Sequence, residues 1–402
     1  MIHHARKMWA AGSALACGVT LAMLAGTLPA QAAPSSTVTK TPTTAPTTAP
    51  TGTVTKPATT PAKGTAGARE RASAAVEAMM SFYDKESGRW DAAEPWWQSG
   101  NALQALLDYS AKTRTTKYMW AIENTIEQQR KPLPWWPEGG GEFRADSTDD
   151  TGWWALAMTR MYDITRDAKY LEIAKTDEAY MRQYWDDVCG GGIWWDIPGK
   201  TYKNAISIEL YIKLVAALHN RIPGDKLYLN RALEAWNWFK KSGMINGEHL
   251  VNDGLQTQSG KCDSNLGITW TYNQGVVLGG LAELYKGTGD RSLLAEARKI
   301  ADAVISSPSL SPKGILTEPC EVGGSCNSDG ASFKGIFVRN LSELDRVLPG
   351  HPYRSYLLTQ ARSAYANDRD SANLYGLRWA GPFDHANIGR QTAAVSLLTS
   401  VL

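Results

Sequence analysis

Apolar residues recur at i, i+3 and i+4 along most of the chain after residue 67, with polar residues between them. This is the period of helices that bury one face. Tight polar turns such as Thr288-Gly289-Asp290 join successive segments in pairs, and an Asp, Thr or Pro begins the helix that follows. Strand-like alternation is almost absent. The pattern predicts about twelve helices, near residues 68–84, 98–112, 116–130, 150–164, 168–186, 204–221, 226–242, 271–286, 291–306, 334–347, 353–367 and 388–401.

The connections between these helices alternate in length. Short turns follow every second helix, and longer loops rich in Gly and Trp follow the others. Helical hairpins that have short turns at one end and long loops at the other suit an all-α closed double ring of helices, the (α/α)6 barrel, with the even-numbered helices inside. An open superhelical repeat array is the structural alternative. In the ring, the N-termini of the inner helices all open on the long-loop face.

The first residues predict export. Residues 1–32 combine a basic start, an apolar run and the small-x-small site Ala30-Gln31-Ala32, so we expect a signal peptide and a secreted, extracellular protein. Cys17 raises a lipoprotein alternative, but the residues before it match a lipobox poorly. No later segment approaches the roughly 20 apolar residues of a membrane span.

Residues 33–67 are almost entirely Thr, Pro, Ala, Ser and Lys, which predicts a disordered linker that spaces the folded domain from the cell surface or from the export machinery. Residues 68–402 then form the folded domain. The whole chain carries 42 basic and 40 acidic residues without a Lys/Arg-rich block, which disfavours nucleic acid as a partner. We expect a monomer.

Four cysteines remain after the signal peptide, an even number in an oxidising compartment. Cys320 and Cys326 flank a Gly-rich loop, so we expect them to pair. Cys189 and Cys262 are then left to pair by elimination, with free buried thiols as the alternative for these two.

Asp149 and Asp150 lie where a loop becomes a strongly apolar helix. One carboxylate is enough to cap a helix, and capping is the structural alternative. A second carboxylate beside the first tends to raise one pKa and leave the other group ionised, which suits a proton donor paired with a nucleophile or base. Neighbouring side chains can place their carboxyls roughly 5 to 5.5 Å apart, the separation of a retaining glycosidase.

Other polar and aromatic residues fall at the expected N-termini of inner helices or in the long loops. The chain has 16 Trp but only 6 Phe, which favours a polar, flat-faced ligand such as a sugar. Amides and charged groups can hydrogen-bond sugar hydroxyls. Asp253 precedes a glycine and could instead form a turn. Trp154, on an apolar helix face, is expected in the core. The candidate substrate-binding residues are Trp97, Gln98, Asn101, Trp136, Trp195, Asn204, Asp253, Tyr272, Asn273, Gln274 and Lys334.

Several motifs resemble glycoside hydrolase family 76, the bacterial endo-α-1,6-mannanases and their fungal cell-wall relatives. The resemblance rests first on Asp-Asp-x-x-Trp-Trp-Ala-Leu-Ala at residues 149–157 and extends over the whole folded domain. The supporting segments are Trp97-Gln98-Ser99-Gly100-Asn101-Ala102-Leu103, Gly191-Gly192-Ile193-Trp194-Trp195, Lys203-Asn204-Ala205-Ile206-Ser207, Thr271-Tyr272-Asn273-Gln274-Gly275 and Phe333-Lys334-Gly335-Ile336-Phe337.

The resemblance implies an (α/α)6-barrel catalytic domain that hydrolyses internal α-1,6-mannosidic bonds of mannan or mannooligosaccharides with retention and without metal or cofactor. It implies Asp149 as nucleophile and Asp150 as general acid/base. A cell-wall mannan transglycosylase and a mannan-binding protein without turnover are the alternatives. A metalloenzyme is disfavoured, because the four histidines after the signal peptide lack ligand-like spacing.

Overall fold

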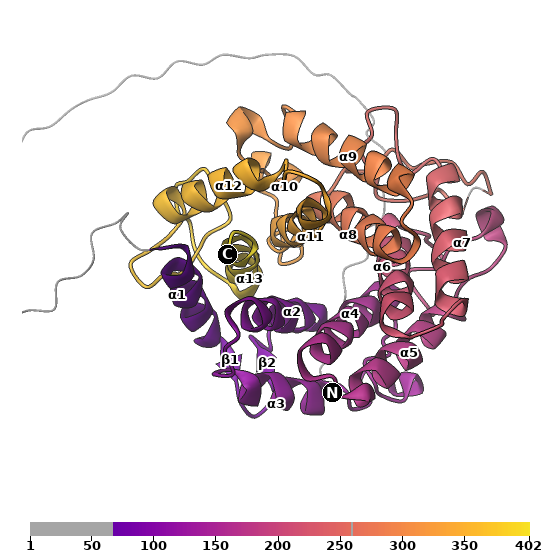
Figure 1. Ribbon diagram of the computed structural model, residues 1–402, viewed down its shortest axis with the longest axis horizontal. Helices are drawn as coiled ribbons and strands as arrows, with labels where there is room; N and C mark the ends of the chain where they lie inside the picture. The colour runs from indigo at the N-terminus through magenta and orange to yellow at the C-terminus, as the bar shows by residue number, and fades with distance from the viewer. Residues whose placement is uncertain (1–66, 259) are drawn as a thin grey trace, which may run out of the picture. The chain divides into compact units, whose positions relative to one another are not determined.

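The computed structural model describes residues 67–258 and 260–402. Six helices form an inner ring in which α2 packs on α4, α4 on α6, α6 on α8, α8 on α11, α11 on α13, and α13 on α2 (Figure 1). The ring is therefore closed, and the predicted (α/α)6 barrel is confirmed over the open repeat array. The inner helices are α2 (Trp96–Thr113), α4 (Thr148–Thr165), α6 (Ala205–Arg221), α8 (Thr271–Thr288), α11 (Phe333–Val347) and α13 (Ile388–Ser400).

A second layer of helices surrounds the ring, each packed on one or two inner helices (Figure 1). All twelve predicted helices are present, with ends that differ by a few residues from those expected. The outer helices are α1 (Ala68–Met80), α3 (Met119–Gln129), α5 (Ala168–Arg182), α7 (Leu227–Lys241), α9 (Arg291–Ser306) and α12 (Arg354–Asn367).

Burial explains which helices are inside. Every residue of α6 from Ala205 to Leu218 is buried, because this helix is enclosed by neighbours on all sides. In α9 the buried residues follow the amphipathic period, at Leu293, Leu294, Ala297, Ile300, Ala301 and Val304, so this helix buries only one face. The predicted core position of Trp154 is confirmed by its stacking between Trp96 and Phe143.

Short polar turns close the hairpins as expected. Asp167 and Asp290 are N-caps, and their carboxylates accept from the amides of Lys169 at 3.0 Å and Ser292 at 2.8 Å. Such caps satisfy amides that the first helical turn leaves without partners. The helix boundaries read from the sequence are therefore reliable at this end of the barrel.

Several elements were not predicted. A two-stranded hairpin, β1 (Tyr83–Asp84) with β2 (Arg89–Trp90), follows α1, and a single-turn helix α10 (Pro319–Val322) precedes α11. Three 3-10 turns lie in the loops at Pro137–Gly139, Val188–Gly190 and Pro312–Gly314. The hairpin supplies Trp90, which is fully buried, to the core.

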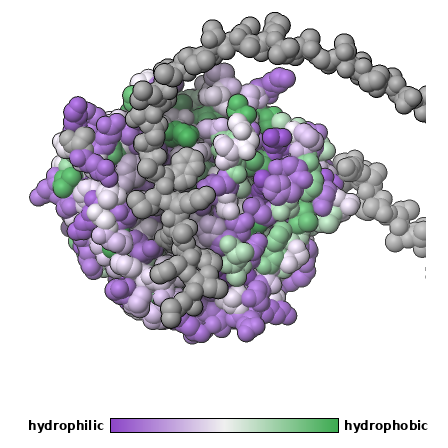
Figure 2. Space-filling view, turned by 180° about the vertical axis from the view of Figure 1, so that it is seen from behind, coloured by the Kyte–Doolittle hydropathy of each residue, from purple (hydrophilic) through white to green (hydrophobic). Residues whose placement is uncertain are grey.

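Figure 2 shows the face of the molecule that points away from the viewer in Figure 1. This face is mostly hydrophilic, with apolar residues in small groups. Within the described residues, none of the helices combines the length and apolar character that a bilayer crossing requires. The predicted signal peptide (1–32) and nearly all of the predicted linker (33–67) lie outside the described residues.

Close approach of inner helices depends on glycine. A Cβ on Gly275 of α8 would lie 2.5 Å from Cα of Phe337 in α11. We expect Gly275→Ala to destabilise the protein by about 1 to 3 kcal/mol, because the backbone of α11 must move. This would occur although alanine favours an isolated helix by about 1 kcal/mol. Urea unfolding measures the difference. Gly247→Ala, with no atom within 4 Å of the added Cβ, is the control. Equal stability of the two variants would contradict the close packing.

Candidate active site

The segment that leads into α4 is held by the loop that follows α5. The Thr148 amide donates to the Trp195 carbonyl at 3.0 Å, and the Ile197 amide donates to the Asp146 carbonyl at 3.0 Å. The Thr148 hydroxyl also donates to the Trp194 carbonyl at 2.8 Å. These bonds fix the first turn of α4, which contains Asp149 and Asp150. The helix begins two residues earlier than predicted, so both carboxylates belong to the helix itself.

Asp149 is desolvated at this helix N-terminus. Its Oδ1 atom is buried without a hydrogen-bond partner. Burial raises the pKa of Asp149 to about 6, while hydrogen bonds from the Asp150 amide and from the side chain of Trp195 oppose the rise. A carboxylate kept partly unsatisfied in this way costs stability, and that is more typical of a reacting group than of a helix cap.

Tyr272 shows that distant segments converge near Asp149. Its ring stacks on Phe333 with centroids 3.9 Å apart. The pKa of the Tyr272 hydroxyl is raised well above its usual value, first by burial and then by the negative charges of Asp253 and Asp149. The N-termini of α4, α8 and α11 and the loop that contains Asp253 therefore lie close together at one end of the ring.

A chain of hydrogen bonds joins Thr148, the residue before Asp149, to Asp253. The Trp195 carbonyl holds Thr148, and the Trp195 amide donates to the Tyr202 carbonyl at 2.8 Å. The Tyr202 hydroxyl then donates to Oδ2 of Asp253 at 2.7 Å. The Asp253 carboxylate is thus held by a tyrosine from another loop, which removes the turn interpretation and leaves sugar binding as the prediction.

The candidate aromatic residues keep part of their rings accessible. Trp195 is 38% exposed and lies beside Asp149. Trp97 is half-buried; it stacks on Trp153 at 5.8 Å, and its indole donates to Asp329 at 3.0 Å. Trp136 is also half-buried and donates to the Tyr180 hydroxyl at 2.9 Å. Each indole is therefore fixed in direction, as a stacking platform for a sugar ring requires.

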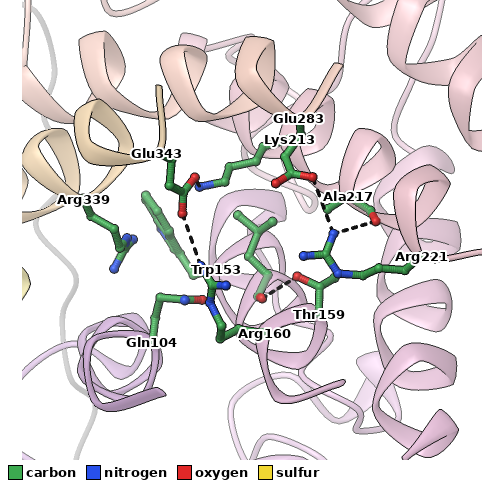
Figure 3. A pocket seen from close by; sticks show the side chains of 11 residues that line it. Gln104, Trp153, Thr159, Arg160, Lys213, Ala217, Arg221, Glu283, Arg339 and Glu343 are labelled. Atoms are coloured by element: carbon green, nitrogen blue, oxygen red, sulfur yellow. Dashed lines mark hydrogen bonds and ion pairs between the residues drawn. The ribbon is translucent and has the colours of Figure 1, made fainter. Parts of the chain in front are cut away.

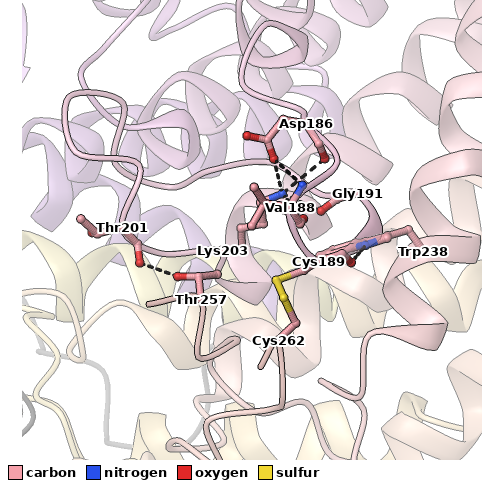
Figure 4. The surroundings of a disulfide bond; sticks show 9 residues. All are labelled: Asp186, Val188, Cys189, Gly191, Thr201, Lys203, Trp238, Thr257 and Cys262. Atoms are coloured by element: carbon pink, nitrogen blue, oxygen red, sulfur yellow. Dashed lines mark hydrogen bonds and ion pairs between the residues drawn. A yellow bond between two sulfur atoms is a disulfide. The ribbon is translucent and has the colours of Figure 1, made fainter. Parts of the chain in front are cut away.

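A buried lysine and a disulfide stabilise the loop that ends in Trp195 (Figure 4). Lys203 is fully buried, and its ammonium donates to Asp186 at 2.7 Å, to the Val188 carbonyl at 2.6 Å and to the Gly191 carbonyl at 2.7 Å. The disulfide between Cys189 and Cys262 ties this loop to the one before α8. The second disulfide joins Cys320 and Cys326, so the structure contains both predicted pairs.

Three predicted substrate-binding residues have internal partners instead. Gln274 exchanges hydrogen bonds with the backbone of Val251 at 2.7 and 2.8 Å. Gln98 donates to the Ser328 carbonyl at 2.6 Å and accepts from the Ser332 hydroxyl at 2.7 Å.

Lys334 is the third, with 1% exposure, an ion pair to Glu321 at 2.5 Å and a hydrogen bond to the Leu377 carbonyl at 2.5 Å. All three side chains hold loops to the barrel through these contacts. Sugar binding by Gln98, Gln274 and Lys334 stays a prediction.

The asparagines also have structural contacts. Asn204 caps α6 through the Ser207 amide at 3.2 Å, and Asn273 donates to Glu209 at 3.3 Å. Sugar binding by their remaining atoms stays a prediction. Asn101 is 2% exposed and accepts from Arg339 at 2.9 Å, and sugar binding by this residue also stays a prediction.

Sequence reasoning missed four residues around the site: Tyr202, Glu209, Asp329 and Phe333. Tyr202 donates to Asp253, and Asp329 accepts from Trp97. Phe333 stacks on Tyr272. The only sequence signal among these four is that Phe333 is the first residue of one of the family motifs. In residues 67–258 and 260–402, no group of three or more His, Cys, Asp or Glu side chains is arranged to hold a metal ion.

The family model described as glycosyl hydrolase family 76 matches residues 68–402, which include nearly all of the described residues. The chain belongs to glycosyl hydrolase family 76. Among curated family 76 relatives, mannan endo-1,6-alpha-mannosidase DCW1 of Saccharomyces cerevisiae is 27% identical over 342 residues, which cover 79% of this chain and 74% of the relative. Mannan endo-1,6-alpha-mannosidase DFG5 of Candida albicans is 25% identical over 357 residues, covering 81% and 78%.

A solved family 76 structure has the same fold. It is the alpha-1,6-mannanase of Salegentibacter sp. HEL1_6, an inactive variant with two consecutive aspartates replaced by alanine, in complex with alpha-1,6-mannotetrose. It superposes with a TM-score of 0.76 and 25% sequence identity, covering 84% of this chain and 99% of that chain. Family membership supports a glycosidase activity for this protein.

The raised pKa of Asp149 predicts a pH-dependent stability difference. The pKa of Asp149 is about 6 in the folded protein, above the ordinary value of 3.8 that we take for the unfolded chain. Ionisation of this carboxyl therefore destabilises the folded protein. The loss of stability develops as the pH rises between these two values and remains at higher pH. We expect Asp149→Asn to stabilise the protein by about 1 to 3 kcal/mol at pH 7.5 and much less at pH 4.

Thermal unfolding at both pH values measures this difference. Asp263→Asn, at an exposed aspartate, is the control and should leave the thermal stability unchanged at both pH values. A gain for Asp149→Asn that is the same at both pH values would contradict the shifted ionisation.

Proposed function

We propose that this protein is a secreted endo-acting glycoside hydrolase that cleaves internal α-1,6-mannosidic bonds of mannan with retention of anomeric configuration. The observation that carries the proposal is the Asp149–Asp150 pair in the first turn of α4, with Oδ1 of Asp149 desolvated and unpartnered. Support comes from the Salegentibacter enzyme, in which replacement of two consecutive aspartates accompanies inactivity and an α-1,6-linked tetrasaccharide is bound.

In the proposed first step, a carboxylate oxygen of Asp149 attacks C1 of a mannose unit and forms an ester bond. The bond from C1 to O6 of the next mannose breaks, and Asp150 transfers its proton to that O6. In the second step Asp150 takes a proton from water, the water oxygen attacks C1, and the ester bond breaks. Two inversions give net retention.

The surrounding residues have supporting roles in this proposal. Trp195, Trp97 and Trp136 offer flat faces to the C–H surfaces of mannose rings, and Asp253 accepts from a sugar hydroxyl. Tyr272 lies between Asp149 and Asp253, near the bond that breaks. Residues 1–32 direct export and residues 33–67 tether the domain.

Separate replacement of the two aspartates tests the mechanism. We expect Asp149→Asn and Asp150→Asn each to reduce cleavage of linear α-1,6-mannan by about 10³-fold or more, with mannooligosaccharide binding retained. Product length from chromatography measures cleavage, and Asp263→Asn is the control for an exposed aspartate. Unchanged behaviour in both variants would indicate a mannan-binding protein. Products longer than the substrate from the wild-type protein would indicate a transglycosylase.

The two roles are distinguished with an aryl glycoside of α-1,6-mannobiose, whose leaving group needs no proton. We expect Asp150→Asn to form its covalent intermediate at a rate close to wild type, whereas Asp149→Asn does not react. The nucleophile must be ionised, so wild-type kcat/KM should fall as the pH drops below about 6, the pKa of Asp149. A fall above pH 6, with the variant results exchanged, would reverse the two assignments.

A further inference from the structure

A polar cavity lies inside the barrel below the space around Asp149. Trp153 separates the two, because one part of its ring stacks on Trp97 while the side chain also lines the cavity. Side chains from α2, α4, α6, α8 and α11 project into the same region (Figure 3). The residues that matter here are Gln104, Arg160, Lys213, Arg221, Arg339 and Glu343.

Most of the buried cations in this cavity have a carboxylate partner. Arg160 contacts Asp108 at 2.7 Å, and Lys213 contacts Glu343 at 2.6 Å. Arg221 pairs with a carboxylate of α4, Asp163, at 2.6 Å. These ion pairs connect the inner helices to one another, as Figure 3 shows for Arg160 and Glu343.

Arg339 is the exception. It is 8% exposed and forms no ion pair within the part of the chain that the structure describes. Its Nη2 donates to Oδ1 of Asn101 at 2.9 Å, but its Nη1 is buried without an acceptor. The Nδ2 atom of the same Asn101 is also buried without an acceptor. Two neighbouring side chains therefore present unused donors.

Arg339 differs from the other buried cations of this network. The ion pairs also include Glu283, which contacts Arg221 at 3.5 Å and Lys286 at 2.7 Å. Arg160, Lys213 and Arg221 each have a carboxylate in contact, whereas the charges of Asp108 and Glu343 act on Arg339 without an ion pair. A buried guanidinium without a charged partner in contact is costly, and water satisfies its hydrogen bonds but not its charge.

We infer that this cavity binds one small monovalent anion, of the chloride class, through the free donors of Arg339 and Asn101. The cavity has about 30 Å³ of space for the centres of water-sized molecules. That is room for a monatomic anion or one or two waters and too little for a phosphate or a sugar. The anion gives Arg339 a contact of opposite charge and holds α2 against α11.

Anion-dependent stability of the wild-type protein tests this inference. At constant ionic strength, replacing sodium gluconate by sodium chloride or bromide should raise the Tm by a few degrees along a saturable curve. In Arg339→Gln this dependence should be lost, whereas Arg378→Gln, at an exposed arginine, should keep it. Identical wild-type Tm values in gluconate and chloride would overturn the inference.

A crystal grown in bromide gives a second readout that needs no variant. An anomalous peak within hydrogen-bond distance of Nη1 of Arg339 and Nδ2 of Asn101 supports the site. Water density there without an anomalous peak overturns it. Neither measurement uses glycosidase activity, so failure of the anion site and failure of the proposed function are distinguishable.

Discussion

The six inner helices pack against one another in a closed ring, and each must bury nearly its whole circumference. Close contacts such as that between Gly275 and Phe337 meet this requirement where two backbones approach. Closure also aligns the helices so that all inner N-termini open on one face. Amides at those termini need acceptors, and the long loops supply them. The site around Asp149 is a consequence of this arrangement, because carboxylates and loop carbonyls gather where the helix amides are unsatisfied.

The two ends of the barrel interior have different electrostatics. Near Asp149 and Asp253, burial raises the pKa of carboxyl groups, and few cations are close. Below Trp153, carboxyls such as Glu343 have lowered pKa values despite burial, because Lys213 and Arg160 contact them. The lower part is built from paired charges that stabilise the ionised form, whereas burial in the upper part disfavours it.

Much of this could be predicted from the sequence, for physical reasons. The helical period and the capped turns at Asp167 and Asp290 are local signals, so the twelve helices and their order were predicted well. The hairpin at Tyr83–Trp90 was missed because two-residue strands are too short to show alternation. Both disulfides followed from the number of cysteines and from the short separation of one pair.

Side-chain direction could not be predicted in the same way. Successive residues of a helix point about 100° apart. Tyr272 therefore faces the space near Asp149, while Gln274, two positions later, faces the loop around Val251. Trp97 and Gln98 diverge for the same reason. A motif at a helix end identifies residues near a site, but which of them face it depends on loops from elsewhere in the chain, and those carry no regular pattern.

The hydrogen-bonded chain from Thr148 through Trp195 and Tyr202 to Asp253 has a further consequence. Two of its three links are made by peptide groups, so the spacing between the two acidic residues is set mainly by main-chain geometry. A substitution at position 195 therefore leaves these peptide links in place, although it removes the hydrogen bond that the indole gives to Asp149. The side chain that contacts the acid can change while the main chain that positions the acid stays the same.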